Sequence, residues 1–360
     1  MSAKQLPEAV GQTITGERCV FPEPGIYPDI DPRVYHAPQR GPLDSYVLSK
    51  SMLWEFRKNP RRWFETPDIV PTKAMMFGNL VDVLTLTPQR FTSLYAVTPK
   101  TYPATESEKV TVQKPWSMNA KYCKEWAKEY PEDHKAKNYP ATYPAQESRP
   151  KEVQKLWNWN ANHCKEWRRE REKEGKDAIT PEEYAAGNEA TKKLHLNDEF
   201  AAMMQNALRQ CAFVAEIEEP ESGMMVRVKC MLDIVPSNAS PFCNAIVDLK
   251  EMAALNSRRE IEAEVARRGY HFQGGLYRDV YNAATGEERE EFWLACQHPE
   301  PPNEVAVKPV DPDALLFGRT QYLRAIALWC RLVKVAPTSW PSPLDDIEHF
   351  ELPAWAYNEP

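Results

Sequence analysis

Apolar and polar positions alternate over residues 226–234, in the second half of the chain. The even positions are apolar, whereas the odd positions include Arg227, Lys229 and Asp233. Because successive side chains of a strand point to opposite faces, the pattern predicts a strand with Asp233 on the same face as two cations. We therefore expect one face of this strand to carry charged side chains.

A second alternating segment covers residues 244–250. It turns Asp248 and Lys250 to one side and Leu249 to the other, so a carboxylate and an ammonium lie next to each other. The alternative is that Asp248 and Lys250 form an ion pair on the protein surface, which would contribute only about 0–1 kcal/mol to stability. An Asp-x-Lys triplet alone is uninformative, since residues 133–135 form another one in a polar stretch without strand character. The neighbouring predicted strand with Asp233 is what favours a functional site.

The hydrophobic pattern of the whole chain predicts an α/β fold with a mixed central sheet flanked by helices. The expected helices cover residues 49–64, 73–86, 181–210, 256–268, 270–283 and 311–335, and the expected strands lie near 212–217, 224–236, 244–249, 291–296 and 304–308. The predicted organisation is a Pro-rich extended arm (1–43), N-terminal helices (44–95), a helical insertion (96–176), and the sheet-containing core with a C-terminal helix and tail (177–360).

The predicted helix over residues 270–281 follows the two strands. It places Gln273 and Tyr277 four residues apart, on one helical face. Gly274 and Gly275 within it each cost about 1 kcal/mol relative to Ala, which suggests a close approach of the backbone to the sheet or to a phosphate chain. The alternative interpretation is that Tyr277 is a core aromatic and Gln273 a solvated amide.

These residue types suit metal-dependent phosphodiester hydrolysis. A hard cation such as Mg²⁺ takes oxygen ligands, polarises the phosphoryl oxygen and generates hydroxide at neutral pH. Asp233 and Asp248 are the candidate ligands, with the backbone carbonyl of Leu249 as a third. Lys250 would orient the attacking water and offset developing charge. Glu216, on the preceding apolar run, is a further candidate acid.

The order Glu216, Asp233, Asp248-x-Lys250 and Gln273-x-x-x-Tyr277 resembles that of the PD-(D/E)xK nucleases of the RecB-like branch. The chain is most similar to the exonuclease VIII (RecE) type. Weaker matches in the same order are the segments 24–27, 48–53, 59–60, 77–88, 179–184, 340–341 and 352–355. The resemblance implies that Arg227, Lys229, Gln273 and Tyr277 contact DNA.

One position departs from the family pattern. The second helix of the family usually reads Gly-x-x-x-His, whereas this chain has Asp82 four residues after Gly78. Asp82 lies on the same helical face, and a carboxylate is a suitable ligand for Mg²⁺ or Mn²⁺. The alternative is that Asp82 is a solvated helix residue and that the site has lost a ligand.

The predicted insertion contains a tandem repeat. Residues 101–129 align without gaps on residues 142–170 at a period of 41, with 17 of 29 positions identical. We expect each copy to form a short helix after an extended entry, with Trp116, Ala120 and Cys123 on one stripe. We interpret the repeat as a duplicated, self-contained packing hairpin. A nucleic-acid contact is the alternative.

Charge and cysteine content change this picture little. The chain has a net charge of −7, but residues 99–176 carry 17 Lys and Arg against 12 Asp and Glu, so the insertion is basic. The eight cysteines are scattered without a Cys-x-x-Cys pair, which predicts neither a zinc site nor a disulfide framework. No apolar run has the length of a membrane span and no signal peptide is evident, so we expect a cytoplasmic protein without membrane contact.

The expected function is that of a Mg²⁺-dependent DNA exonuclease acting on the ends of linear double-stranded DNA. The 5′–3′ polarity, the recombination role and a single-strand annealing protein as partner follow from the resemblance. No Gly-rich loop ending in Gly-Lys-Ser/Thr is present, so the enzyme should not use ATP and a homo-oligomer would provide processivity. A structure-specific or restriction-type endonuclease, and a non-catalytic DNA-binding or assembly protein, are the alternatives.

Overall fold

The structure is a computed structural model that describes residues 23–28, 30–37, 39, 42–66, 71–253, 255 and 257–345. The chain forms two compact units, which we call the core unit (1–91 with 185–360) and the insertion unit (Thr92–Tyr184). Most of the predicted arm at 1–43, and the tail motif at 352–355, fall outside the described residues.

A six-stranded sheet forms the centre of the core unit. Its order is β1 (Gly25–Tyr27), β6 (Leu208–Glu218), β7 (Met225–Val235), β8 (Ala245–Glu251), β9 (Glu291–Gln297) and β10 (Val305–Pro309). The β8–β9 pair is parallel and the others are antiparallel. Because the parallel pair needs a long connection, the chain between β8 and β9 contains the helices α11 (Arg258–Arg268) and α12 (Tyr270–Thr285). The predicted mixed sheet is confirmed.

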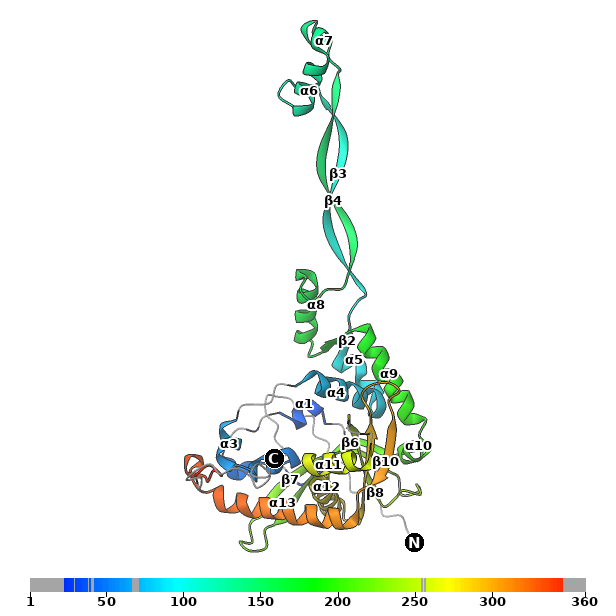
Figure 1. Cartoon of the computed structure of the whole chain (residues 1–360). Helices are drawn as coiled ribbons and strands as arrows, with labels where there is room; N and C mark the ends of the chain where they lie inside the picture. Colours follow the sequence, from blue (N-terminus) through cyan, green and yellow to red (C-terminus); the bar gives the residue numbers. More distant parts are fainter. Residues whose placement is uncertain are drawn as a thin grey trace, which may run out of the picture. The chain divides into compact units, whose positions relative to one another are not determined.

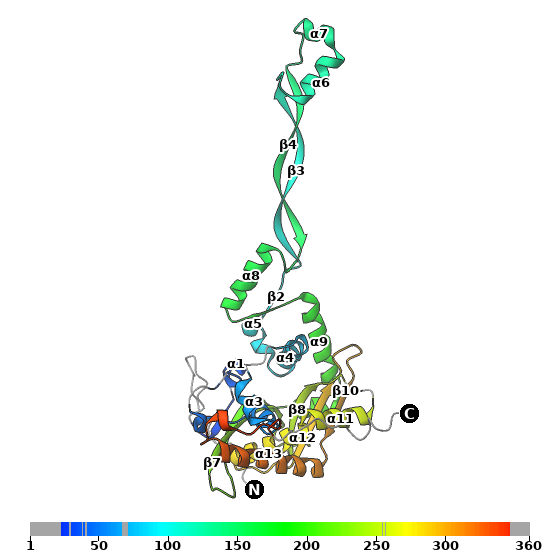
Figure 2. The same ribbon diagram turned by 60° about the vertical axis from the view of Figure 1, so that its left-hand side comes forward.

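Helices cover both faces of this sheet. The largest apolar cluster joins β6–β9 to α2 (Lys50–Phe56), α12 and the long helix α13 (Pro312–Leu332) on one face, and Figure 1 and Figure 2 show α13 running beneath the sheet. A second cluster joins the opposite face to α4 (Lys73–Leu86), α9 (Pro181–His195) and α10 (Asp198–Met204). The core unit is therefore an α/β/α sandwich.

The remaining described helices are short. They are α1 (Pro32–Tyr35), α3 (Pro60–Glu65), α5 (Phe91–Leu94), and the 3-10 turns η1 (Leu43–Ser45), η2 (Pro88–Arg90) and η3 (Pro337–Ser339). Two predicted helices are each divided. The helix expected at 181–210 breaks where Asn197 caps α10, and the one expected at 49–64 breaks where Asn59 caps α3. None of the helices in the described part of the chain has the length and apolar character needed to cross a membrane.

The glycines of α12 permit a close crossing with α13. A Cβ at Gly275 would lie 2.8 Å from the backbone nitrogen of Arg319, and one at Gly318 would lie 2.1 Å from the carbonyl oxygen of His271. The close approach expected at Gly274 and Gly275 is therefore present, and it is an approach to α13 and to Phe292 of the sheet.

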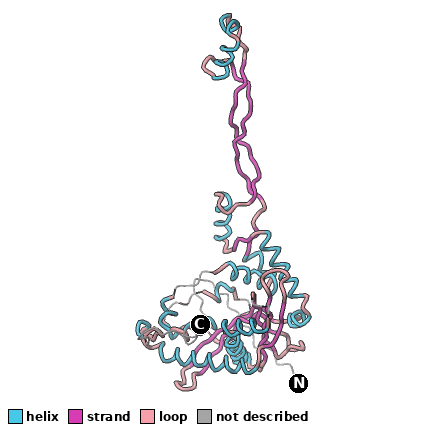
Figure 3. Tube along the Cα trace, viewed as in Figure 1, coloured by secondary structure: helices cyan, strands magenta, loops and turns pink. Residues whose placement is uncertain are grey.

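The insertion unit contains two small sheets. β2 (Tyr95–Val97) pairs in parallel with β5 (Asp177–Ile179), and β3 (Thr101–Pro115) pairs antiparallel with β4 (Thr142–Leu156) as a long two-stranded ribbon (Figure 3). The helices are α6 (Lys121–Glu129), α7 (Pro131–Lys135) and α8 (Asn162–Lys173).

Two expectations for the repeat are wrong. Trp116 precedes α6 and so cannot form a helical stripe with Cys123. The strand of each copy pairs with the strand of the other copy, so neither copy is a self-contained hairpin. The strands are only weakly amphipathic, since the half-buried face of β3 carries Tyr102, Ala104, Val110 and Val112 together with charged residues, and so sparse an apolar pattern was not recognised as a strand.

Candidate active site

Asp233 is held between two strands that meet only briefly. β7 and β8 pair at Ile234 and Val247. The carboxylate of Asp233 is buried there, where its Oδ2 accepts a hydrogen bond of 2.8 Å from the backbone nitrogen of Leu249. Its Oδ1 accepts a bond of 2.9 Å from Nε2 of Gln210. The side chain therefore spans the opening between β7 and β8.

Asp248 lies on the next strand and is 2% exposed. Its Oδ1 accepts a hydrogen bond of 2.7 Å from Nε2 of Gln273, and Nζ of Lys250 lies 2.5 Å from its Oδ2. Gln273 and Tyr277 both belong to α12, and Tyr277 is close enough for Asp248 and Asp233 to raise its pKa further, although burial is the main cause of the increase. The four predicted residues Asp233, Asp248, Gln273 and Tyr277 are thus brought together with Lys250.

Asp82 joins this group from α4. Burial raises its pKa to about 7, helped by the negative charges of Asp248 and Glu251 and opposed by Lys250. Burial also raises the pKa of Asp233 well above its ordinary value, and the negative charge of Asp248 raises it further. Burial alone would lower the pKa of Lys250, but Asp248 and Asp233 outweigh it and raise that pKa. The cluster holds more negative charge than one lysine can balance.

This donor set fits a hard divalent cation. Three carboxylates repel one another here, and the buried Oδ2 of Asp248 faces the ammonium of Lys250 at 2.5 Å, so it lies where positive charge is needed. The oxygens do not form a finished coordination shell. Within the described ranges, no three His, Cys, Asp or Glu side chains are already gathered as metal ligands. The reason is that Gln210 and Leu249 engage Asp233, while the ammonium of Lys250 lies where positive charge is needed.

A cavity of about 600 Å³ opens onto the cluster. Asp82 and Lys250 line it directly. Other lining residues are Glu251, Arg267, Arg268, Tyr270 and His298. Acidic and basic side chains therefore both line the cavity, and Asp82 and Lys250 connect it to the cluster.

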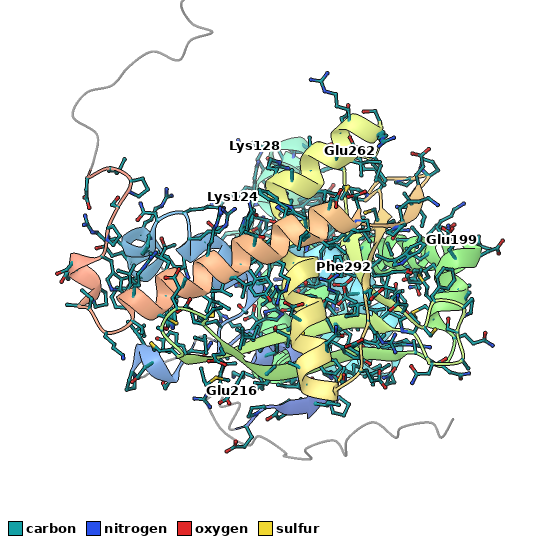
Figure 4. All side chains as sticks on the ribbon, turned by 90° about the horizontal axis from the view of Figure 1, so that it is seen from below. Lys124, Lys128, Glu199, Glu216, Glu262 and Phe292 are labelled. Atoms are coloured by element: carbon teal, nitrogen blue, oxygen red, sulfur yellow. The ribbon has the colours of Figure 1, made fainter. Side chains whose placement is uncertain are left out.

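Three predicted site residues lie elsewhere. Glu216 is exposed and pairs in register with Arg227, six residues from Asp233 along β7, which is about 20 Å. Figure 4 shows Glu216 at the margin of the core unit. Arg227 donates a long bond of 3.4 Å to the carbonyl of Ser45. Lys229 is buried, with Nζ donating to the carbonyl of Tyr35 at 2.6 Å. Strand alternation predicted the face of the sheet on which these side chains lie, but not their distance from Asp233 along the strands.

Lys50 is a site residue that the sequence analysis did not identify. Its Nζ donates to the carbonyl of Arg268 at 2.8 Å, and its pKa is lowered to about 8, first by burial and then by Lys250. The ammonium groups of Lys50 and Lys250 lie 5.8 and 5.7 Å from the ring centroid of Tyr270. The only sequence feature near Lys50 was the weak family match at 48–53. That match indicates a helix, but it does not predict where the side chain of Lys50 points.

Gln210 is the second residue that was not identified. Its backbone adopts a left-handed conformation with φ of 47°, which interrupts the β6–β7 ladder opposite Asp233 and lets its amide reach the carboxylate. A non-glycine residue in this region is uncommon and often marks a functional position. No sequence pattern predicted this conformation.

Further cations surround Trp54 on α2. The guanidinium carbon of Arg57 lies 3.7 Å from the centroid of the Trp54 ring, and Nζ of Lys58 and Nζ of Lys50 lie 5.1 and 5.5 Å from it. The Nε of Arg57 is buried without a hydrogen-bond partner. Positive charge therefore extends from the cluster along α2.

No curated protein matches the sequence. One matching solved structure is a protein from Eubacterium rectale that carries the provisional name of an exonuclease. It is 14% identical over 80% of this chain and 81% of that one, with a TM-score of 0.44, a likeness too distant to carry an argument.

A family match is more informative. The family described as a PDDEXK-like domain of unknown function (DUF3799) matches residues 51–340. The prediction of the PD-(D/E)xK superfamily is thereby confirmed, and the match supports a nuclease, of a class that generally depends on divalent metal ions. The exonuclease VIII type stays a prediction. With Asp233, Asp248 and Lys250 inside the matched range, the chain belongs to this family of PDDEXK-like domains.

Proposed function

We propose that this protein is a Mg²⁺- or Mn²⁺-dependent, ATP-independent exonuclease that degrades linear double-stranded DNA from its ends, with 5′–3′ polarity, to expose single strands for recombination. The observation that supports hydrolysis most directly is the buried Asp248–Lys250 pair beside Asp233 and Asp82. A homo-oligomer and a single-strand annealing protein as partner belong to the same proposal and rest on the resemblance.

Each residue has a role in this proposal. Asp82, Asp233, Asp248 and the carbonyl of Leu249 would hold the cation. When bound, the cation would polarise the phosphoryl oxygen and lower the pKa of water. Lys250, already beside Asp248, would move toward the water or the phosphate once its carboxylate partner binds metal. Gln273 would keep the Asp248 carboxylate in position through its 2.7 Å bond.

Digestion of end-labelled linear duplex and of covalently closed circular duplex, each with Mg²⁺ and with EDTA, tests the proposal. An exonuclease consumes the linear DNA only, and only with the metal. Cleavage of the closed circle would instead indicate the endonuclease alternative. Binding of DNA without any metal-dependent cleavage would indicate a non-catalytic protein.

The pKa of Asp82 predicts a dependence of stability on pH in EDTA. The folded protein keeps this proton up to about pH 7, whereas an unfolded chain loses it near the ordinary value of 3.8. The unfolded state therefore binds fewer protons between these values, so the stability contribution of Asp82 falls as pH rises from about 4 to about 7. The change should be a few kcal/mol, at about 1.4 kcal/mol per pKa unit.

Thermal unfolding in EDTA at pH 5.5 and pH 8, compared between the wild type and Asp82→Asn, measures this contribution. The Asn variant should gain more stability over the wild type at pH 8 than at pH 5.5, where only about half of the loss has accumulated. Mg²⁺ should stabilise the wild type more at pH 8, because the ligands must be deprotonated. An equal effect of Asp82→Asn at both pH values would contradict a buried, charge-coupled Asp82.

Lys50→Ala should lower kcat/KM about tenfold or more, since a second cation beside Lys250 would be lost from the phosphate path, and about 1.4 kcal/mol corresponds to a factor of ten. Lys58→Ala, just beyond the opposite end of the same helix, is the control. Lys58 is exposed and paired with Glu55 at 2.7 Å, so its loss should change kcat/KM less than threefold. Equal effects of the two substitutions on initial rates would remove Lys50 from the site.

A further inference from the structure

The two repeat copies have the same local structure. Trp116 meets Trp126 edge-on at 5.1 Å, and the equivalent pair of the second copy meets at 5.2 Å. The contacts between the copies also repeat. Tyr122 of α6 stacks on Tyr143 of β4, and the equivalent residues His163 of α8 and Tyr102 of β3 stack in the same way. Each helix therefore packs on the strand of the other copy.

The strand register shows a local two-fold symmetry. Glu108 lies opposite Arg149, and these two residues occupy the same position of the 41-residue repeat. Around this centre one ion pair is made twice, between Lys114 and Glu147 at 2.8 Å and between the equivalent residues Lys155 and Glu106 at 2.9 Å. An interface in which both partners use the same residues is isologous, as in a two-fold dimer.

A single copy lacks a partner for its strand. The 15-residue strand is largely exposed on both faces, and even a paired two-stranded ribbon is only marginally stable without further packing. We propose that one copy, residues 142–170, is a self-complementary association module, which in a chain with a single copy would pair with the same segment of a second molecule of that chain. In the present protein, the duplication satisfies this module within one chain.

The proposal predicts the path of a chain with one copy removed. Deleting residues 101–141 joins Lys100 to Thr142 in repeat register. The remaining strand spans about 50 Å when extended, so its end cannot return to its own Lys100. In the observed ribbon, the backbone nitrogen of Trp157 donates to the carbonyl of Lys100. In the two-chain ribbon Trp157 would lie beside Lys100 of the second molecule, and β5 would pair with β2 of that molecule.

A single cysteine introduced into the deletion variant tests whether two molecules pair through this strand. Two-fold pairing places position 149 opposite itself and position 146 about 20 Å from itself. In a background with Cys19→Ser and Cys243→Ser, Arg149→Cys should therefore link most chains into covalent dimers under mild oxidation. Gln146→Cys should give only background dimer. The full chain with Arg149→Cys is the second control, because there position 149 faces Glu108 of its own chain.

Exchange of β5 gives an independent readout. Ala96 of β2 and Ala178 of β5 are register partners. Deletion variants that carry Ala96→Cys and Ala178→Cys separately should form a mixed disulfide after co-expression, whereas two full chains with the same substitutions should not. A folded deletion variant, judged by circular dichroism, that lacks both the position-149 link and the mixed link overturns the proposal.

Two separate proline substitutions test whether the backbone hydrogen bonds between the two strands hold the dimer together. The backbone hydrogen bonds from Trp116 to Ala141 and from Trp157 to Lys100 show which alternate residues direct their backbone N–H groups toward the opposite strand. Val153 is one of these residues. Pro144 and Pro150 belong to the other set. In the deletion variant, Val153→Pro should abolish the position-149 link and Gln154→Pro should keep it. Loss of the link in both, or retention in both, contradicts strand pairing.

Should the deletion variant fail to fold alone, its complement keeps the proposal testable. Deleting residues 130–170 retains the first copy, so co-expressing the two deletions restores the native Glu108–Lys151 pair, which neither variant can form with itself. Glu108→Cys in one and Arg149→Cys in the other should then form a mixed disulfide. Absence of this disulfide from a soluble co-expressed pair overturns the module.

Discussion

Asp233→Asn and Asp248→Asn should both abolish hydrolysis, by a factor on the order of 10³ or more, but should change the stability of the metal-free protein in opposite directions. Asp233→Asn removes one of three mutually repelling carboxylates, and an amide oxygen can still accept the bond from Leu249. The free energy of unfolding should rise. Loss of activity with a gain of stability is typical of a charge cluster maintained for function.

Asp248→Asn leaves the ammonium of Lys250 without the carboxylate that lies 2.5 Å away. Removing one partner of a buried pair costs about 3–5 kcal/mol, and the 24% exposure of the Lys250 side chain reduces this to about 1–3 kcal/mol. Urea unfolding in EDTA at pH 8 measures both variants. Glu216→Gln is the control, since this exposed residue should change neither activity nor stability. Near wild-type cleavage by either Asn variant would contradict the metal assignment.

Local periodicity predicted the part of the site that lies on three consecutive elements. Alternation in β7 and β8 placed Asp233, Asp248 and Lys250, and the four-residue spacing on α12 placed Gln273 and Tyr277. The structure brings these residues together, and local patterns could anticipate this because each depends on the direction of a side chain within one element. Glu216, Arg227 and Lys229 lie apart from this group because a face of a strand extends for tens of ångströms, and periodicity carries no information on position along it.

Residues contributed by distant segments need other information. Asp82 came from the family resemblance and not from its helical pattern, which is apolar on most sides. Lys50 reaches the cluster only because α2 packs against the start of α12, a tertiary contact that no local pattern describes. The β3–β4 ribbon is a similar case, since each strand pairs with the strand of the other repeat copy. Pairing between copies cannot be inferred from either copy alone.

Gly318→Ala should have the largest effect on stability of any single methyl group added to the described core. Its Cβ would lie 2.1 Å from the carbonyl oxygen of His271 and 2.7 Å from the backbone nitrogen of Phe272. Both obstacles are backbone atoms of α12, so a rotamer change cannot relieve the clash and the two helices must separate. We expect a loss of about 3 kcal/mol or more, at or above the upper end of the range for overpacking.

Two other glycines provide graded controls. A Cβ at Gly274 would meet only side chains, Leu315 and Phe292 at 2.6 Å, so Gly274→Ala should cost less than Gly318→Ala. At Gly78 the nearest atom is Oε2 of Glu251 at 3.1 Å, the end of a flexible side chain, and Ala should stabilise α4 by up to about 1 kcal/mol. Urea unfolding followed by circular dichroism should rank the variants in this order.

The effect of Gly318→Ala should also reach the candidate site. Helix α12 carries Gln273, whose amide bonds Asp248 at 2.7 Å, so a displacement of α12 by even 1 Å weakens the support of that carboxylate. Below the unfolding temperature, Gly318→Ala should therefore lose nuclease activity in addition to stability, whereas Gly78→Ala changes stability without moving α12. A Gly318→Ala protein within 1 kcal/mol of the wild type would show that the α12–α13 crossing yields easily, and that Gln273 does not depend on it.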